Sequence, residues 1–309
     1  MTSRNHPFPH ASVSRRTMLL GSLGGALALG GCAREATGPA PATSAAPTAS
    51  DSATPTPGPS VTPTPEPTAS AAPTASASQM AARATVPVLC YHQVRPYASG
   101  DSAYTKQALV IPPERFDAHL DAIAEAGWTT IGPDAYLDHL RTGAALPEKP
   151  VILTFDDGKD NQHATALPAL AKRGMTGTWF IMTVVLGKKG WTAADDVRKA
   201  VDSGMTIGCH TWDHHDVRKY TDADFTTQFD EARATLQQLS GQPVETFAYP
   251  YGAWNEAALP KLEAAGFTTA FQLSDKPLDP ALPQLTLRRL LAISTWSGAD
   301  VVAKLDAFA

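Results

Sequence analysis

The stretch VILTFDDG, residues 151–158, joins a run of large apolar side chains to two adjacent carboxylates and a glycine. The apolar run predicts a buried β-strand, because strands covered on both faces are continuously hydrophobic. Asp156 and Asp157 follow at the end of this strand, where neighbouring carboxylates are costly to bury unless a cation or a hydrogen-bond donor compensates them. The alternative interpretation is an ordinary Asp-Asp-Gly turn without chemistry.

Short β-rich runs like this one alternate with amphipathic helical stretches. The expected strands are 86–91, 150–155, 178–182, 206–209, 245–249, 268–272 and 285–293, and the expected helices are 113–126, 133–140, 161–173, 193–203, 222–239, 255–265 and 298–308. About seven β/α alternations predict an α/β fold with a parallel sheet, either open or closed as a barrel. In such barrels the chemistry lies at the carboxyl ends of the strands.

The expected strand 206–209 leads into HTWDHHD, residues 210–216. His210 and His214 are four residues apart, the spacing at which two imidazoles on one helical turn converge on one ion. Together with a carboxylate, two histidines form a facial triad for a divalent metal ion with open positions. His215 is a competing ligand if the turn is not helical, and a histidine-rich surface turn is the alternative without a metal.

The expected strand 245–249 runs into PYG, residues 250–252. Pro250 removes a backbone donor and Gly252 permits close backbone approach, so we expect the Tyr251 N–H to point inward at an anion. Taken alone, this segment would be an ordinary turn at the end of a strand.

The motifs TFDDG, HTxxH and PYG, in this order and at strand ends, resemble the NodB-homology polysaccharide deacetylase family from Val86 to the end of the sequence. The resemblance implies a distorted (β/α)7 barrel that hydrolyses N-acetyl groups on a cell-surface or extracellular polysaccharide and releases acetate. It implies Asp156 as the general base, and Asp157, His210 and His214 as ligands of zinc, with cobalt or nickel as alternatives. An O-acetyl esterase acting on xylan-like glycans, an amidase acting on a small non-sugar amide, and a non-catalytic glycan-binding module remain open.

The sequence departs from the family pattern in its third motif, RxPYG. Ala248 occupies the arginine position, so the guanidinium that orients the base is absent there. Arg288 or Arg289, on the late expected strand, is our candidate for supplying it from elsewhere.

The late Leu-x-x-His motif of the family, which brings the general acid, is also missing, because no histidine follows His215. The opening VPVLCYH, residues 86–92, resembles the poly-N-acetylglucosamine deacetylase branch, in which an N-terminal Tyr-His strand takes that place. His92 is therefore the candidate general acid, and His163 is the reserve candidate.

Residues 1–32 have the features of an export signal. A twin arginine, Arg15-Arg16, precedes an apolar stretch and resembles a Tat signal. The stretch falls short of the roughly 20 apolar residues that span a bilayer. The LGGC ending at Cys32 resembles a lipobox, so we expect a lipid-anchored protein on the extracellular face of the cell membrane, with plain signal cleavage as the alternative.

Composition divides the remaining chain in two. Residues 33–84 are rich in Ala, Pro, Ser and Thr and predict a disordered tether, whereas 85–309 is long enough for one catalytic domain. The chain carries 25 Lys and Arg against 30 Asp and Glu, a net charge of -5 without a basic patch, which argues against nucleic acid as a partner. Cys90 and Cys209 are expected to be separate buried thiols, because side-chain alternation makes a disulfide between them awkward.

Overall fold

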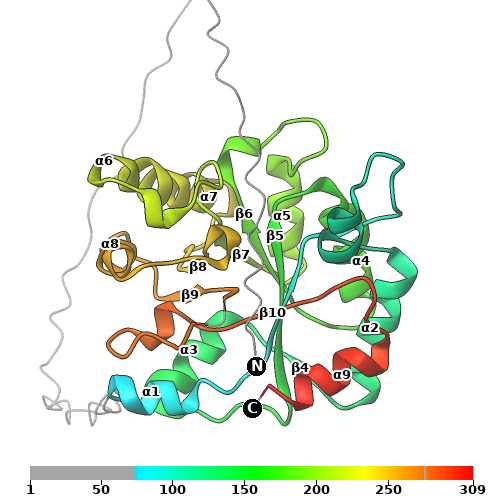
Figure 1. Ribbon diagram of the computed structural model, residues 1–309, viewed down its shortest axis with the longest axis horizontal. Coiled ribbons are helices and arrows are strands. Elements are labelled where there is room, and N and C mark those ends of the chain that lie inside the picture. Colours follow the sequence, from blue (N-terminus) through cyan, green and yellow to red (C-terminus); the bar gives the residue numbers. More distant parts are fainter. Residues whose placement is uncertain (1–73, 275, 309) are drawn as a thin grey trace, which may run out of the picture. The chain divides into compact units, whose positions relative to one another are not determined.

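The computed structural model describes residues 74–274 and 276–308, which form an α/β fold around a parallel sheet (Figure 1). The strands of this sheet follow the order β10-β1-β5-β6-β7-β8-β9. Their bounds are β1 (Val88–Tyr91), β5 (Pro150–Asp157), β6 (Thr178–Ile181), β7 (Thr206–Cys209), β8 (Thr246–Ala248), β9 (Thr269–Phe271) and β10 (Leu290–Leu291). Three short strands accompany them: β2 (Gln93–Val94) pairs with β3 (Val110–Ile111), and β4 (Thr129–Thr130) pairs with β5.

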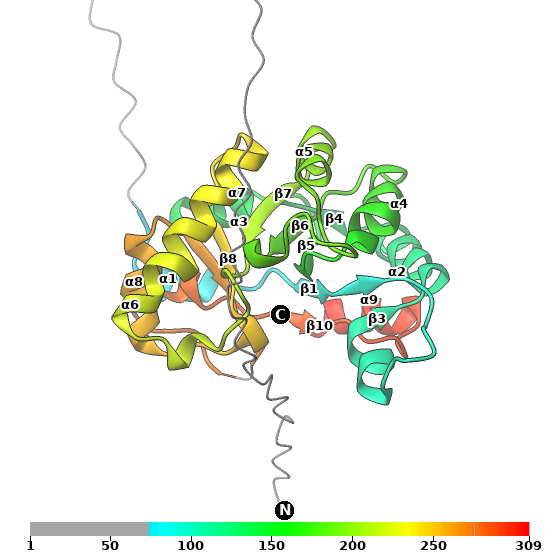
Figure 2. The ribbon, with the colours of Figure 1, turned by 90° about the horizontal axis from the view of Figure 1, so that it is seen from above.

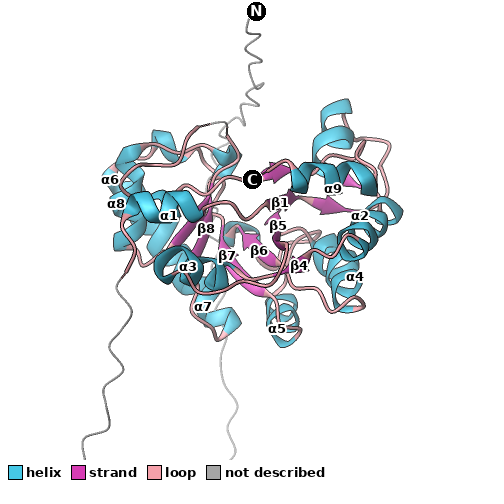
Figure 3. Cartoon of the chain, turned by 90° about the horizontal axis from the view of Figure 1, so that it is seen from below, coloured by secondary structure: helices cyan, strands magenta, loops and turns pink. Residues whose placement is uncertain are grey.

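Helices lie around the outside of the curled sheet (Figures 2 and 3). They are α1 (Ala77–Arg83), α2 (Pro113–Glu125), α3 (Pro133–Thr142), α4 (Leu167–Ala171), α5 (Ala194–Asp202), α6 (Asp222–Phe225), α7 (Ala232–Ser240), α8 (Leu259–Ala264) and α9 (Gly298–Asp306). The longest of them, α2, buries Phe116, Leu120 and Ile123 at helical spacing, as an amphipathic helix on a core should. None of the helices in the described ranges is long and apolar enough to cross a lipid bilayer.

The segment before β10 brings the two edges of the sheet together. Phe271, at the end of β9, forms a parallel bridge with Leu287, and the next residues continue into β10, which pairs with β1. One short segment therefore contacts β9 first and β1 next, and Arg289 lies between the two contacts. The expected distorted (β/α)7 barrel is confirmed.

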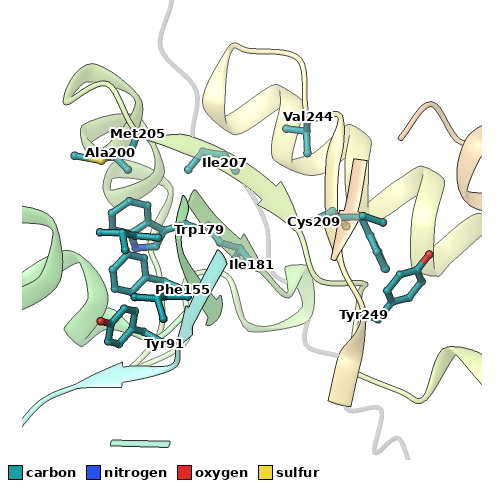
Figure 4. Packing of buried hydrophobic residues seen from close by; sticks show 14 of the residues in the cluster. Tyr91, Phe155, Trp179, Ile181, Ala200, Met205, Ile207, Cys209, Val244 and Tyr249 are labelled. Carbon is teal, nitrogen blue, oxygen red and sulfur yellow. The ribbon is translucent and has the colours of Figure 1, made fainter. Parts of the chain in front are cut away.

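An aromatic stack fixes the strands that carry the site. The Phe155 ring lies 5.6 Å from the Tyr91 ring and 4.7 Å from the Trp179 ring, measured between centroids (Figure 4). These three side chains belong to β1, β5 and β6, and all are fully buried. Because side chains alternate along a strand, Asp156 points to the opposite side of the sheet from Phe155.

The expected strands were placed within a few residues of the observed ones, except at the end of the chain. The prediction of one strand over 285–293 is wrong, since only Leu290–Leu291 is a strand and Pro283–Leu285 is a 3-10 turn. This segment contacts β9 first and β1 next, so it cannot form one continuous hydrogen-bonded ladder with a single strand. The expected helices 161–173 and 222–239 exist but contain wider π-type turns at Gln162–Ala166 and Thr226–Glu231.

The tether predicted over 33–84 is wrong for its last residues, because α1 lies inside it. Ser76 and Gln79 form a reciprocal capping box at the start of α1, and Met80 is buried against the core. The Arg83 guanidinium donates to the Leu140 carbonyl at 2.9 Å and attaches the helix to α3. The export signal and the rest of the tether lie outside the described residues. Both remaining cysteines are free and buried, as expected.

Candidate active site

The candidate residues come from five separate strand ends. Asp156 and Asp157 close β5, His92 follows β1, and His210 follows β7. Tyr251 comes shortly after β8, and Arg289 directly precedes β10. The strands β1, β5, β7 and β8 run parallel in one curled sheet. Their carboxyl ends therefore lie together at the same end of the barrel.

Arg289 holds the Asp156 carboxylate with two parallel hydrogen bonds. Nη1 donates to Oδ1 at 2.7 Å and Nη2 donates to Oδ2 at 2.8 Å, and Nη1 also reaches Thr154 Oγ1 at 3.1 Å. Burial alone would raise the pKa of Asp156, but the buried guanidinium lowers this pKa well below its usual range. The carboxylate therefore stays ionised. Arg288 is exposed and lies over the Phe308 ring, so Arg289 is the arginine that contacts Asp156.

Asp157, His210 and His214 converge in a second group. Asp157 Oδ1 lies 3.7 Å from His210 Nε2 and 3.5 Å from His214 Nε2. Two ligands on a tetrahedral zinc ion with bonds of about 2.1 Å lie roughly 3.4 Å apart. The spacing and the oxygen and nitrogen donors therefore fit one divalent metal ion.

The protonation of the two histidines favours this role. His210 Nδ1 lies 2.7 Å from the Ala248 carbonyl, which can only accept, so Nδ1 carries the proton and Nε2 keeps its lone pair. Burial lowers the pKa of His210, and burial together with the neighbouring His210 lowers the pKa of His214 to about 4. Both rings are neutral near pH 7, as metal ligation requires.

The loop 210–216 reaches this geometry without a helical turn, so the helical interpretation of the HTxxH spacing is wrong. Thr211 and His214 have φ values of 67° and 65°, and Asp157 and Tyr251 also have positive φ. Such conformations cost about 1–3 kcal/mol each and persist where the surroundings fix them. Of the five non-glycine residues with positive φ among those the structure describes, these four belong to the site.

His215 does not compete with His214 in this arrangement. Its side chain is 76% exposed, and its Nδ1 lies 3.1 Å from Asp213 Oδ2. The structure thus brings His214 to Asp157 and leaves His215 on the surface.

Cys90, His92 and Asp156 form another cluster, in which one potential ligand atom of each residue lies within 4.8 Å of the others. A metal ion here would compete with the buried Arg289 cation for both carboxylate oxygens of Asp156. Burial raises the pKa of Cys90 well above its usual range, so the thiol stays protonated and donates to Asp156 Oδ2 at 3.5 Å. Asp157 and its two histidines are therefore the better candidate group for a metal ion, and this cluster places His92 beside the carboxylate of Asp156.

His163, the reserve candidate for the general acid, lies elsewhere in the packing. Its Nε2 contacts Thr192 Oγ1 at 2.9 Å, and its ring stacks on Trp179. It is nearly buried, and burial lowers its pKa. These contacts with Thr192 and Trp179 are structural.

Two exposed aromatic side chains belong to the segments that carry the candidate ligands and the PYG motif. Tyr251 is 62% exposed, with its ring 4.6 Å from the His214 ring, and Trp212 is 41% exposed two residues before His214. Trp254 is buried, and Trp296 packs against the core. Within 74–274 and 276–308 the Tyr251 N–H donates to no backbone carbonyl. The exposed Tyr251 ring therefore lies directly beside the candidate ligand His214.

No motif in the sequence points to Gln228, whose side chain holds the loop of the candidate ligands. Its Oε1 accepts from the Trp212 N–H at 3.1 Å, and its Nε2 donates to Asp213 Oδ1 at 2.9 Å. The residue lies in the π-type turn Thr226–Glu231, a local widening of a helix that often occurs at functional sites. Polar residues within an expected helix are ordinarily assigned to its solvent face, so periodicity alone could not reveal this role.

Comparison with known proteins matches residues 143–270 to the sequence model of the polysaccharide deacetylases. YxkH of Bacillus subtilis (strain 168), named as a polysaccharide deacetylase, is 28% identical over 184 residues, which cover 60% of this chain and 63% of that protein. The poly-beta-1,6-N-acetyl-D-glucosamine N-deacetylase of Staphylococcus aureus (strain MRSA252) is 25% identical over 177 residues, or 53% and 61% of the two chains. The chain thus spans less than two thirds of the length of these relatives. The structure of IcaB from Ammonifex degensii is 27% identical, with a TM-score of 0.59, over 72% of this chain and 97% of that one.

Proposed function

Because the chain belongs to the polysaccharide deacetylase family, we propose that it hydrolyses N-acetyl groups of an extracellular or cell-surface polysaccharide in a metal-dependent reaction that releases acetate. One observation carries the proposal. The ionised Asp156 carboxylate, held by Arg289, lies directly beside a group of one carboxylate and two neutral imidazoles suited to a divalent ion. The similarity to a poly-beta-1,6-N-acetyl-D-glucosamine N-deacetylase supports N-acetylglucosamine polymers as the substrate class.

In this mechanism Asp157, His210 and His214 would hold a zinc, cobalt or nickel ion, which supplies Lewis acidity to the acetyl carbonyl and to water. Asp156 takes a proton from the water as its oxygen forms a bond to the carbonyl carbon. Arg289 keeps Asp156 ionised and oriented for this transfer.

The remaining steps need a donor to the oxyanion and a proton for the leaving amine. The Tyr251 N–H is our candidate donor to the oxygen of the tetrahedral carbon, an interaction typically worth roughly 10²–10³ in rate. His92 donates a proton to the nitrogen as the C–N bond breaks, so acetate and a free amine are released.

Acetate release from a panel of acetylated glycans tests the function. We expect the full chain to release acetate from N-acetylated glucosamine oligomers, and an Asp156→Asn protein to release almost none. Release from acetylated xylan alone would identify an O-acetyl esterase. Metal binding and glycan binding without release from any substrate would identify a non-catalytic module.

The exposed ring of Trp212, two residues before His214 in the sequence, is suited to stacking on a sugar ring of a polymer. We expect Trp212→Ala to raise KM for a long N-acetylated oligomer about tenfold, the effect of losing about 1.4 kcal/mol of binding. Turnover of a small acetyl ester, which has no second sugar ring to stack, should change little. An unchanged KM for the oligomer would remove Trp212 from substrate binding.

We also propose that the chain is exported and anchored through a lipid on Cys32, because residues 1–32 resemble a Tat-type lipoprotein signal. A Cys32→Ala protein should lose incorporation of labelled fatty acid and should be found in the medium. If it stays in the membrane fraction without label, the apolar stretch is the anchor and the lipobox assignment is wrong.

A further inference from the structure

We propose that Asn161 and Gln162, two amide side chains just after the Asp-Asp-Gly turn, are positioning residues that set the distance between His92 and Asp156. The inference rests on the proposed function, in which Asp156 accepts a proton from the attacking water and His92 donates a proton to the leaving nitrogen. It adds a physical reason why His92 can act as the acid although it lies outside the regular strand pairing.

The backbone at His92 needs such support because the ladders stop on either side of it. The last pair between β1 and β5 joins Tyr91 to Phe155, and β2 begins at Gln93 and pairs with β3 instead. His92 itself belongs to neither strand. Its position relative to β5 is therefore set by other contacts.

Gln162 supplies the first of these contacts. Its side-chain Nε2 donates to the backbone carbonyls of both His92 and Asp156. An amide nitrogen carries two hydrogens, so this one side chain uses its full donor capacity on the two residues that the mechanism pairs. Gln162 is fully buried.

The orientation of the Gln162 amide follows from the same contacts. If the amide were flipped, its oxygen would face two carbonyl oxygens that can only accept hydrogen bonds. In the observed orientation Oε1 is buried and accepts no hydrogen bond from the part of the chain that the structure describes. A buried acceptor without a partner is unfavourable, so the two donor bonds must outweigh that cost.

Asn161 supplies the second contact, on the other side of His92. Its Oδ1 accepts from the Val94 N–H at 2.8 Å, two residues after His92. The π-type turn Gln162–Ala166 begins directly after Asn161 and widens the helix start next to the strand ends. The chain around His92 is thus attached to the Asp156 strand by Gln162 and to the start of this turn by Asn161.

The positioning of His92 can be tested separately by comparing two substrates, one that releases an amine and one that releases a phenolate. An amine must be protonated as it leaves, whereas the phenolate of an activated aryl acetate leaves without a proton. Turnover of the aryl acetate therefore depends on Asp156 and the oxyanion donor but hardly on His92. A displaced His92 should lower amide turnover and leave ester turnover nearly unchanged.

Asn161→Ala is the most direct variant, because Asn161 is half-buried and its side-chain hydrogen bond among the described residues goes to the Val94 N–H, just after His92. We expect kcat for an N-acetylated glucosamine oligomer to fall about tenfold, since displacements near 1 Å can cost up to about 10²-fold. KM for the oligomer, metal content and kcat for the aryl acetate should stay within about twofold. Asn161→Asp keeps the acceptor oxygen and should recover most of the amide turnover.

Asn255→Ala is the matched control, because Asn255 Oδ1 also accepts a backbone N–H, that of Ala258, at 3.1 Å. It should leave the ratio of amide to ester turnover unchanged. Gln162→Leu should lower this ratio more than Asn161→Ala does. An equal loss on both substrates, or an unchanged ratio in Asn161→Ala, would overturn the inference.

A second measurement keeps the inference testable if the wild-type protein proves not to hydrolyse the oligomer, a result that would refute the proposed function instead. In NMR spectra of the full chain loaded with Zn²⁺, Asn161→Ala should shift or broaden the imidazole signals of His92. The imidazole signals of His210 and His214 should be unaffected. Unchanged His92 signals would overturn the positioning role whatever the activity.

Discussion

We expect a His214→Ala protein to lose tight binding of a divalent metal ion, and a His215→Ala protein to keep it. His214 Nε2 lies 3.5 Å from Asp157 Oδ1, whereas the His215 side chain is 76% exposed and paired with Asp213. Acetate release should fall at least about 10²-fold in His214→Ala, because a bound ion contributes several kcal/mol to the transition state.

The measurement for this pair is metal content after dialysis, together with kcat on an N-acetylated oligomer. The two variants control for each other, because each removes one imidazole from the same loop. Loss of the ion in His215→Ala with retention in His214→Ala would move the ligand assignment by one residue.

The second large effect is expected for His92→Ala, in which kcat for an N-acetylated glycan should fall by roughly 10²–10⁴, the usual size of positioned acid catalysis. Histidine is suited to this step because its unperturbed pKa is the closest to neutral pH. The metal and the fold should be retained, because His92 belongs to neither the metal group nor a strand.

Leaving-group dependence identifies the role of His92 more sharply than the size of the loss. In His92→Ala, kcat for an acetyl ester should fall less than kcat for an acetamide, because an alkoxide leaves with less help than an amine anion. Near-normal turnover of the N-acetylated glycan by His92→Ala would return this residue to a structural role.

The fold could be predicted from the sequence because its strands are short, apolar and separated by helices of ordinary length. The region around 285–293 could not be predicted, since the segment contacts β9 through Leu287 and β1 through β10, and its hydrophobicity resembles that of a continuous strand. Helix α1 was missed because the composition of the preceding residues concealed its capping box, Ser76 with Gln79.

The site residues that belong to motifs at strand ends could be predicted from the sequence. Asp156, Asp157, His210 and His214 meet because parallel strands place their carboxyl ends together. The sequence could not decide between Arg288 and Arg289, because adjacent residues of an extended segment point to opposite sides and the register was unknown.

The supporting amides were beyond the reach of sequence reasoning. Asn161, Gln162 and Gln228 act on backbone atoms of residues distant in sequence, or on a loop before their own helix. Such contacts have no characteristic sequence spacing. Asn161 directly precedes a π-type turn, and Gln162 and Gln228 lie within such turns. These turns interrupt the helical period, so the period does not show which way the side chains point.

The central claim is that the ion held by Asp157, His210 and His214 and the carboxylate of Asp156 act together. Acetate release from an N-acetylated β-1,6-glucosamine oligomer, measured before chelation, after chelation and after re-addition of Zn²⁺, tests it most directly. We predict that release is lost with the metal and returns when a single ion is bound, whereas Asp156→Asn binds the ion and stays inactive. Undiminished release by the metal-free protein would contradict the account.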